Sequence, residues 1–126
     1  MKVEVVQTDA APKAIGPYSQ AVTAGGWVFA SGQIPLDPAS GEMVGGPFAA
    51  QAKRALDNLG GVLRAAGCDR AGVVKVTVYL ADLARFAEFN EIYAAFFGDH
   101  RPARAVIGAA SLPRGAQVEV EALAVR

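Results

Sequence analysis

An arginine at the expected start of a strand is the first residue of this sequence that could do chemistry. Arg104 follows Pro102 and Ala103 and opens an apolar run. A guanidinium fixed at a strand end can form two parallel hydrogen bonds to a carboxylate or a phosphate. The alternative is an arginine at a strand edge that extends its charged group into solvent. Position alone leaves both roles open.

Two glutamates alternate with apolar residues in the segment 118-VEVEA-122. In a strand, Glu119 and Glu121 would point to the same face as Leu123 and Val125. A carboxyl group that is partly removed from water has a raised pKa and can act as a general acid or base. Glutamates on an exposed sheet face can also be simply solvated or paired with an arginine. The pattern therefore makes both residues candidates for acid–base work without excluding the simpler role.

Hydroxyl and amide groups gather at two expected strand ends. In 15-IGPYSQA-21, Tyr18 begins a run of two hydroxyls and an amide directly after a Gly-Pro turn signal. In 30-ASGQIP-35, a strand ends in Ser31 and Gly32. Ser31 and the Gly32 amide could bind an oxyanion, or they could only terminate the strand.

Composition excludes several classes of function. Twelve basic and twelve acidic residues cancel and form no run of like charge, which gives no support to a nucleic-acid or anionic-membrane partner. Cys68 and His100 are single, so an intrachain disulfide and a Cys/His metal site are excluded, and no serine or cysteine has an obvious histidine base. We expect Cys68 to be a packed thiol. Without a signal sequence or a membrane span, a single cytoplasmic domain over residues 1–126 is expected.

The elements that must position these residues follow from periodicity and turn signals. The pattern predicts strands at 2–6, 19–24, 27–33, 73–80, 104–110 and 116–125, with helices at 48–66 and 83–97. We expect Asp82 to cap the second helix and Gly60-Gly61 to let the first helix approach the sheet closely. In the strand 73–80, Val74, Val76, Val78 and Leu80 are expected on one face. This order predicts an α+β fold, a mixed sheet of about six strands with two helices on one face.

The opposite face of this sheet must also be covered, because its residues are mostly small and apolar. Hydrophobic residues make up 52% of the chain and charged residues only 19%, below the usual quarter. This surplus hints that other subunits cover part of the surface.

Taken in order, these stretches resemble one known family. IGPYSQA, ASGQIP, LDNL, VVKVTVYLADL, the PAR before Ala105, and LPRGAQVEVEALAV are similar to the RidA (YjgF) family of reactive-intermediate deaminases, from about Ala11 to Val125. The resemblance implies a chorismate-mutase-like fold and a homotrimer with a central barrel-like core and three intersubunit clefts. It implies hydrolysis of enamine and imine intermediates, such as 2-aminoacrylate and 2-iminopropanoate, to 2-keto acids and ammonia, with no cofactor.

The resemblance also assigns roles to individual residues. Arg104 matches the arginine that binds the substrate carboxylate, and Glu119 matches the acidic residue that orients the attacking water. Tyr18 and Ser31 match residues of the substrate cleft, with the Gly32 backbone beside them. Val106 stands where some relatives carry a cysteine, so a thiol has no role there.

Two other functions are compatible with parts of this pattern. A non-catalytic sensor of 2-keto acids would need Arg104 but not Glu119. Ribonuclease activity or inhibition of translation, attached to some relatives, is disfavoured by the neutral charge balance and the absence of a Lys/Arg stripe. The sequence neither supports nor excludes a chaperone function.

Overall fold

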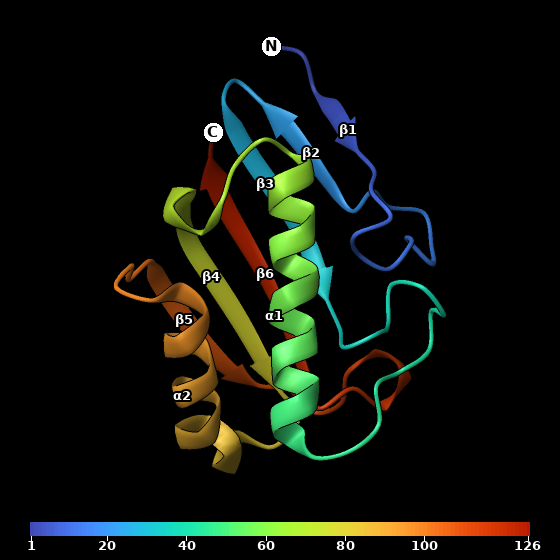
Figure 1. Ribbon diagram of the computed structural model, residues 1–126, viewed down its shortest axis with the longest axis vertical. Helices are drawn as coiled ribbons and strands as arrows, with labels where there is room; N and C mark the ends of the chain where they lie inside the picture. Colours follow the sequence, from blue (N-terminus) through green and yellow to red (C-terminus); the bar gives the residue numbers. More distant parts are fainter.

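Six strands form one sheet in the order β1-β2-β3-β6-β4-β5 in the computed structural model, which describes residues 1–126 (Figure 1). The β4–β5 pair is parallel and the other pairs are antiparallel. The strands are β1 (Glu4–Val6), β2 (Ala21–Ala24), β3 (Trp27–Gln33), β4 (Val73–Leu80), β5 (Ala103–Gly108) and β6 (Val118–Val125). Helices α1 (Phe48–Ala65) and α2 (Phe86–Phe97) lie on one face, which confirms the predicted mixed sheet.

The core lies between this sheet and the two helices. Helix α1 crosses in front of the middle of the sheet, and α2 lies beside it over the β5 edge (Figure 1). Leu56, Leu59 and Leu63 of α1 and Phe89 of α2 are fully buried. Burial of a leucine or phenylalanine side chain contributes about 1.5–3 kcal/mol, so these apolar stripes fix both helices on the sheet.

Strand β6 presents its charged residues on the face away from the helices. Val118, Val120, Ala122 and Ala124 are buried, whereas the residues between them remain partly or fully accessible. The prediction that Glu119 and Glu121 share a face with Leu123 and Val125 is therefore confirmed. This face, which no helix covers, is called the outer face below.

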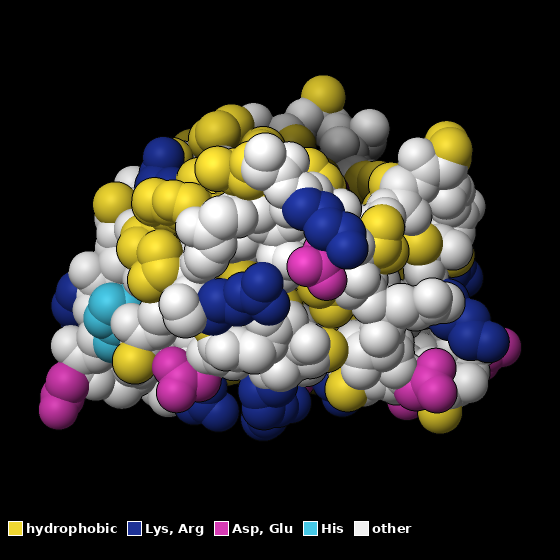
Figure 2. Space-filling model, turned by 90° about the horizontal axis from the view of Figure 1, so that it is seen from above, with side chains coloured by type: hydrophobic (Ala, Val, Ile, Leu, Met, Phe, Trp, Pro, Cys, Tyr) yellow, Lys and Arg dark blue, Asp and Glu magenta, His cyan; other side chains and the backbone are white.

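The outer face is largely apolar. Trp27, Phe29, Ile107, Leu123 and Val125 are each 37–44% exposed, although their side chains are large and hydrophobic. Figure 2 shows apolar side chains gathered along one side of the molecule and charged side chains concentrated along the other. Exposed apolar surface of this kind is typical of a face that another protein covers.

The predicted face of β4 is wrong at its first residues. Val74 is exposed and Val73 is buried, because the register with β6 shifts between Val73 and Lys75. A bulge of this kind places two residues opposite one and reverses the alternation locally. From Val76 onward the predicted alternation holds.

Two details of the helices also differ from the prediction. The expected helix 83–97 begins as a 3-10 turn at Leu83–Arg85, and Asp82 caps that turn by accepting from the Ala84 amide. The close approach at Gly61 is to the Ala10 carbonyl of the N-terminal loop, where an added Cβ would collide, and not to the sheet. The predicted end of α1 at Gly67 is confirmed, with φ at +86°.

Candidate active site

A cleft of about 370 Å³ opens where β3 ends and β6 begins, beside the N-terminal loop. Its walls include Tyr18, Ser31, Gly32 and Glu119, four of the five residues to which the family resemblance assigned a role. The fifth, Arg104, does not line it. The structure therefore divides the expected site into two parts.

Glu119 is the acidic group of this cleft. It projects from β6 toward the backbone of Gly32 on β3, where a Cβ would collide with its carboxylate. The register between β3 and β6 is irregular from Ala30 to Gln33, which brings Gly32 out of regular pairing. Partial burial raises the pKa of Glu119, and the neighbouring charge of Glu121 raises it further. A half-buried carboxylate of this kind is a better proton acceptor near neutral pH than an exposed one.

Ser31 ties β3 to the segment that precedes β2 at the border of the cleft. Its hydroxyl donates to the Ser19 carbonyl at 2.6 Å, and its amide donates to the Gln20 carbonyl at 2.9 Å. Both donors of Ser31 are thus engaged within the chain. The hydroxyl oxygen can still accept a hydrogen bond from a ligand, but it has no proton left to donate to an oxyanion.

The N-terminal loop is held in place by Gln20, which is buried. The side-chain oxygen of Gln20 accepts from the Thr8 amide, and its nitrogen donates to the carbonyls of Thr8 and Pro12. These bonds position the segment that carries Lys13, which lies on the rim of the cleft. A buried amide with several backbone partners fixes a loop that has no regular secondary structure.

Tyr18 lies at the mouth of the cleft and is 47% exposed. Its hydroxyl accepts a hydrogen bond from the Ile15 amide at 3.3 Å, and its ring packs on Gly16. Because the hydroxyl acts as an acceptor there, its own proton remains available to a ligand.

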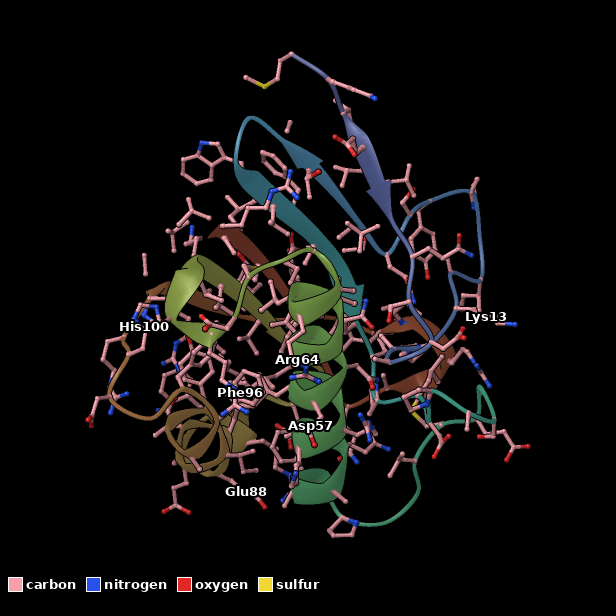
Figure 3. The ribbon with its side chains drawn as sticks, turned by 45° about the horizontal axis from the view of Figure 1, so that its top comes forward. Lys13, Asp57, Arg64, Glu88, Phe96 and His100 are labelled. Atoms are coloured by element: carbon pink, nitrogen blue, oxygen red, sulfur yellow. The ribbon has the colours of Figure 1, made fainter.

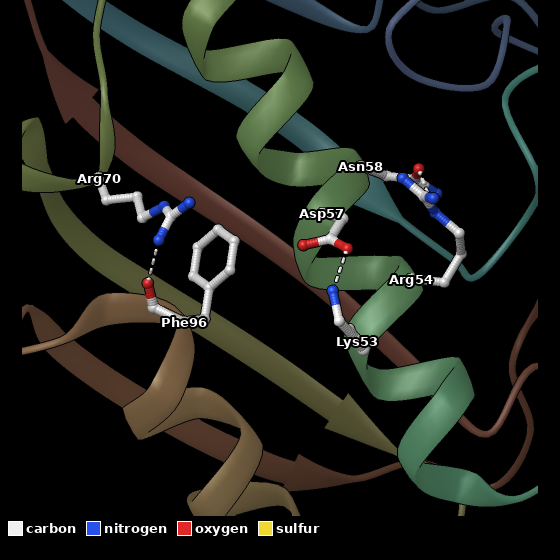
Figure 4. A network of polar contacts seen from close by, with 6 residues as sticks. All are labelled: Lys53, Arg54, Asp57, Asn58, Arg70 and Phe96. Carbon is white, nitrogen blue, oxygen red and sulfur yellow. Dashed lines mark hydrogen bonds and ion pairs between the residues drawn. The ribbon is translucent and has the colours of Figure 1, made fainter.

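The opposite wall of the cleft is anchored to α1. The side-chain nitrogen of Asn58, which is fully buried, donates to the carbonyls of Ile34 and Leu36, and both of these residues line the cleft. Arg54 donates from Nε to the side-chain oxygen of Asn58 at 3.0 Å and so orients its amide (Figure 4). The sequence pattern gave this role to neither residue.

Arg104 lies on the other face of the sheet. It pairs in register with Val76 of β4, whose side chain is buried against the helices, whereas Glu119 pairs with Tyr79. Its guanidinium lies 4.7 Å from the ring centre of Tyr93 and 5.6 Å from that of Phe86, both on α2. It makes no hydrogen bond or ion pair within the chain. The N–H donors of a partly buried guanidinium without an acceptor are free to bind an anion.

Two further polar groups on α2 also lack partners. The side-chain oxygen of Asn90 and the hydroxyl of Tyr93 are buried and make no hydrogen bond. Asn90 lies on the same helix face as Phe86 and Tyr93, because residues three and four apart are neighbours on a helix. The sequence pattern missed Asn90 and read Phe86 and Tyr93 only as parts of an apolar stripe.

The two parts of the site are well separated within one chain. Arg104 on β5 lies two strand spacings, about 10 Å, across the sheet from Glu119 on β6. It is also offset by three residues, about 10 Å, along the strands, and the two side chains are on opposite faces of the sheet. Figure 3 shows Lys13 of the cleft rim and His100, which precedes β5, at opposite sides of the molecule. One small ligand cannot touch both parts of the same chain.

The other reactive side chains add little. Burial raises the pKa of the Cys68 thiol, which agrees with the predicted packed thiol. No three His, Cys, Asp or Glu side chains are grouped as metal ligands would be. None of the helices combines the length and apolar character needed to cross a membrane.

Comparison with known proteins decides the family. The model of the family described as endoribonuclease L-PSP matches residues 8–126. This chain belongs to the endoribonuclease L-PSP family. The resemblance to RidA (YjgF) is thereby confirmed, since the crystal structure of the Escherichia coli YjgF gene product is among the L-PSP-like chains that superpose on it.

The similarity to these L-PSP family proteins extends over nearly the whole chain. The YjgF structure matches with a TM-score of 0.93 and 44% identity, covering 98% of both chains. A mouse protein named 2-iminobutanoate/2-iminopropanoate deaminase is 53% identical over 123 residues, which are 98% of this chain and 91% of the mouse protein. The crystal structure of E. coli TdcF with bound serine matches with a TM-score of 0.93 and 41% identity, covering 98% of both chains.

Proposed function

We propose that this protein hydrolyses small 2-imino acids, such as 2-iminopropanoate and 2-iminobutanoate, to 2-keto acids and ammonia. The observation that carries the proposal is a half-buried carboxylate in a cleft, on a chain that also presents a guanidinium without a partner elsewhere on its surface. The names of the mammalian relatives, at about 50% identity, support the same reaction. The serine bound to TdcF supports a site of this family that accepts a small amino acid.

The reaction requires little of the protein beyond holding the substrate and one water molecule in the right positions. Glu119 accepts a proton from a water molecule while the water oxygen bonds to the imine carbon, whose nitrogen is protonated. The resulting carbinolamine then loses ammonia as the carbon–nitrogen bond breaks and the carbonyl forms, with a hydroxyl proton moving to the leaving nitrogen. An enamine such as 2-aminoacrylate enters the same route once it is protonated on carbon. Arg104 holds the carboxylate so that the imine carbon faces the water.

Arg104 and Glu119 of the same cleft come from different copies of the chain in this proposal. Their separation in one chain prevents a single subunit from supplying both. The exposed apolar residues of the outer face offer a contact surface for another copy. A homotrimer with three intersubunit clefts fits these features. Tyr18, Ser31 and Gly32 complete the cleft on the glutamate side, and we place this activity in the cytoplasm.

A carboxylate sensor without catalysis is the main alternative. It would use Arg104 and the cleft but would have no need of a carboxylate whose pKa is raised. A ribonuclease, as the family description suggests, would need a basic surface to bind phosphates. Figure 2 shows Lys and Arg side chains separated by acidic and neutral ones on the face in view, without a continuous basic stripe.

The decisive experiment generates 2-aminoacrylate in situ and follows its loss with and without the protein. Faster appearance of 2-keto acid with the wild type is expected. Glu119→Gln keeps the shape of the side chain but removes the base, so turnover should fall about 10²-fold or more. Binding of 2-ketobutyrate through Arg104, measured by calorimetry, should survive. Normal hydrolysis by Glu119→Gln would contradict this mechanism.

The assembly is tested separately by light scattering. The mass should be about three times the 13.0 kDa of one chain. An active monomer would contradict both the trimer and the shared cleft.

A further inference from the structure

A second carboxylate lies beside Glu119 on the outer face. Glu121 follows it by two residues on β6, and both side chains point away from the helices. In an extended strand this spacing corresponds to about 7 Å between Cα atoms. The deamination mechanism uses Glu119 and leaves Glu121 without a role.

Glu121 is held by a side chain from the neighbouring strand. The hydroxyl of Tyr79 on β4 donates to Oε1 of Glu121 at 2.8 Å. Tyr79 is, however, the cross-strand partner of Glu119, and Glu121 is opposite Thr77. The phenol therefore reaches diagonally from the position opposite Glu119 to the carboxylate of Glu121. This hydrogen bond holds the Glu121 carboxylate in place on the outer face.

Few other charges face Glu119 from the elements packed around it. The adjoining β3 residues, Ser31, Gly32 and Gln33, carry no charge, and β4 contributes the neutral phenol of Tyr79. The N-terminal loop brings Lys13 and Tyr18 to the rim. Two more basic residues lie nearby in the same chain: Lys75 is opposite Leu123, and Arg114 donates to the Gly41 carbonyl. In the proposed trimer, Arg104 of the adjoining copy would be the third. Glu121 is thus the anion nearest to Glu119.

We propose that Glu121, held by the hydroxyl of Tyr79, is a positioning residue that keeps Glu119 basic enough to take a proton from water near neutral pH. A fixed negative charge beside Glu119 disfavours its ionised form and so strengthens it as a base. Burial is the main cause of the raised pKa of Glu119, and the charge of Glu121 raises it further in the direction that serves the reaction. The inference rests on the proposed function for its purpose, but the coupling of the two carboxyl groups can be measured without turnover.

The test compares Glu121→Gln and Tyr79→Phe with the wild type by two measurements. The first is the pH dependence of kcat/KM for imine hydrolysis. The second is the titration of the Glu119 carboxyl carbon by NMR in protein labelled with ¹³C-glutamate, with the signal assigned from Glu119→Gln. Glu91→Gln is the matched control, because Glu91 is an exposed glutamate on α2, on the other side of the sheet.

Glu121→Gln should lower the midpoint of the acid limb and the NMR midpoint of Glu119 together, by roughly 0.5–1 pH unit for a like charge at this distance near the surface. Tyr79→Phe should lower both by a smaller amount, because Glu121 loses the donor that holds its carboxylate in place. The maximal kcat should fall a few-fold in Glu121→Gln, with KM unchanged, because the base is weaker. Glu91→Gln should leave both midpoints where they are.

An unchanged NMR midpoint for Glu119 in Glu121→Gln, with the assembly intact by light scattering, would overturn the proposal. If Glu121→Gln does not fold, Tyr79→Phe decides, and an unchanged midpoint there has the same meaning. An NMR shift combined with no imine hydrolysis by the wild type would instead refute the proposed function and leave the coupling standing.

Discussion

Activity should be recoverable by mixing two inactive variants, if Arg104 and Glu119 act from different copies of the chain. The perturbation is a pair of single variants, Arg104→Ala and Glu119→Gln. Each removes one half of every cleft when it assembles alone. Loss of the base should lower turnover about 10²-fold or more, and loss of the carboxylate partner should lower kcat/KM similarly.

The size of the recovery follows from the geometry of a ring of three chains. In the proposed trimer, each cleft would take Glu119 from one copy and Arg104 from the next, because the contact in a three-fold ring joins two different surfaces. In a random mixture at equal amounts, the first copy retains Glu119 half of the time, and the next retains Arg104 half of the time. About one quarter of the clefts are therefore complete, which lies far above the residual activity of either parent.

The assay uses trimers assembled by refolding the two variants together, with imine hydrolysis measured against each parent refolded alone. The control replaces Glu119→Gln by the double variant that carries both substitutions, because that mixture contains no complete cleft. No recovery above the parents, in trimers proven to be mixed, would refute the argument that the site is shared between copies.

Three further outcomes are expected. Arg104→Lys should raise KM for the imine and weaken 2-ketobutyrate binding while the assembly stays intact, because an ammonium cannot form two parallel hydrogen bonds to a carboxylate; unchanged KM would exclude the arginine as the clamp. Gly32→Ala should lower turnover at least about 10-fold with little loss of thermal stability, because the new Cβ displaces the Glu119 carboxylate and not a core side chain; steady-state kinetics and a melting curve together check this. Glu119→Gln should stabilise the fold at neutral and higher pH, by less than about 1 kcal/mol after screening by water, because the raised pKa of Glu119 means that its charged form opposes folding. That gain should disappear below the unfolded pKa of glutamate, where the group is protonated in both states, and a gain that grows toward acid pH would contradict the assigned direction.

Local pattern was sufficient to predict most of the fold and the glutamate side of the site. Alternation in a strand is a property of neighbouring residues, so Glu119 and Glu121 could be placed on one face without knowledge of the partner strands. The end of α1 at Gly67 could likewise be predicted from neighbouring residues alone. Val74 was misplaced because the bulge at this position depends on how β4 pairs with β6, which no local pattern contains.

The features that could not be predicted from the sequence depend on contacts between residues far apart in the chain. Gly61 was correctly expected to allow a close approach, but its partner, the Ala10 carbonyl, is about fifty residues away in the chain. That Arg104 and Glu119 face opposite sides of the sheet depends on the registers of two separate strand pairs, and a shift of one residue would reverse either face. Asn90 was missed because a single polar residue in an apolar helical stripe gives no periodic signal.

The unsatisfied groups connect stability with function in this fold. A buried polar atom without a partner costs about 1–3 kcal/mol, and the arginine side of the site contains two, on Asn90 and Tyr93, next to a guanidinium with no acceptor. The glutamate side adds a carboxylate whose charge is opposed by burial and by Glu121. Each chain thus carries two incomplete half-sites and an exposed apolar sheet face. Assembly would cover the apolar face and bring each arginine side against a glutamate side, so that a carboxylate ligand supplies the acceptor that Arg104 lacks. Substitutions that weaken the outer-face contact should therefore reduce ligand binding even where they touch neither Arg104 nor Glu119.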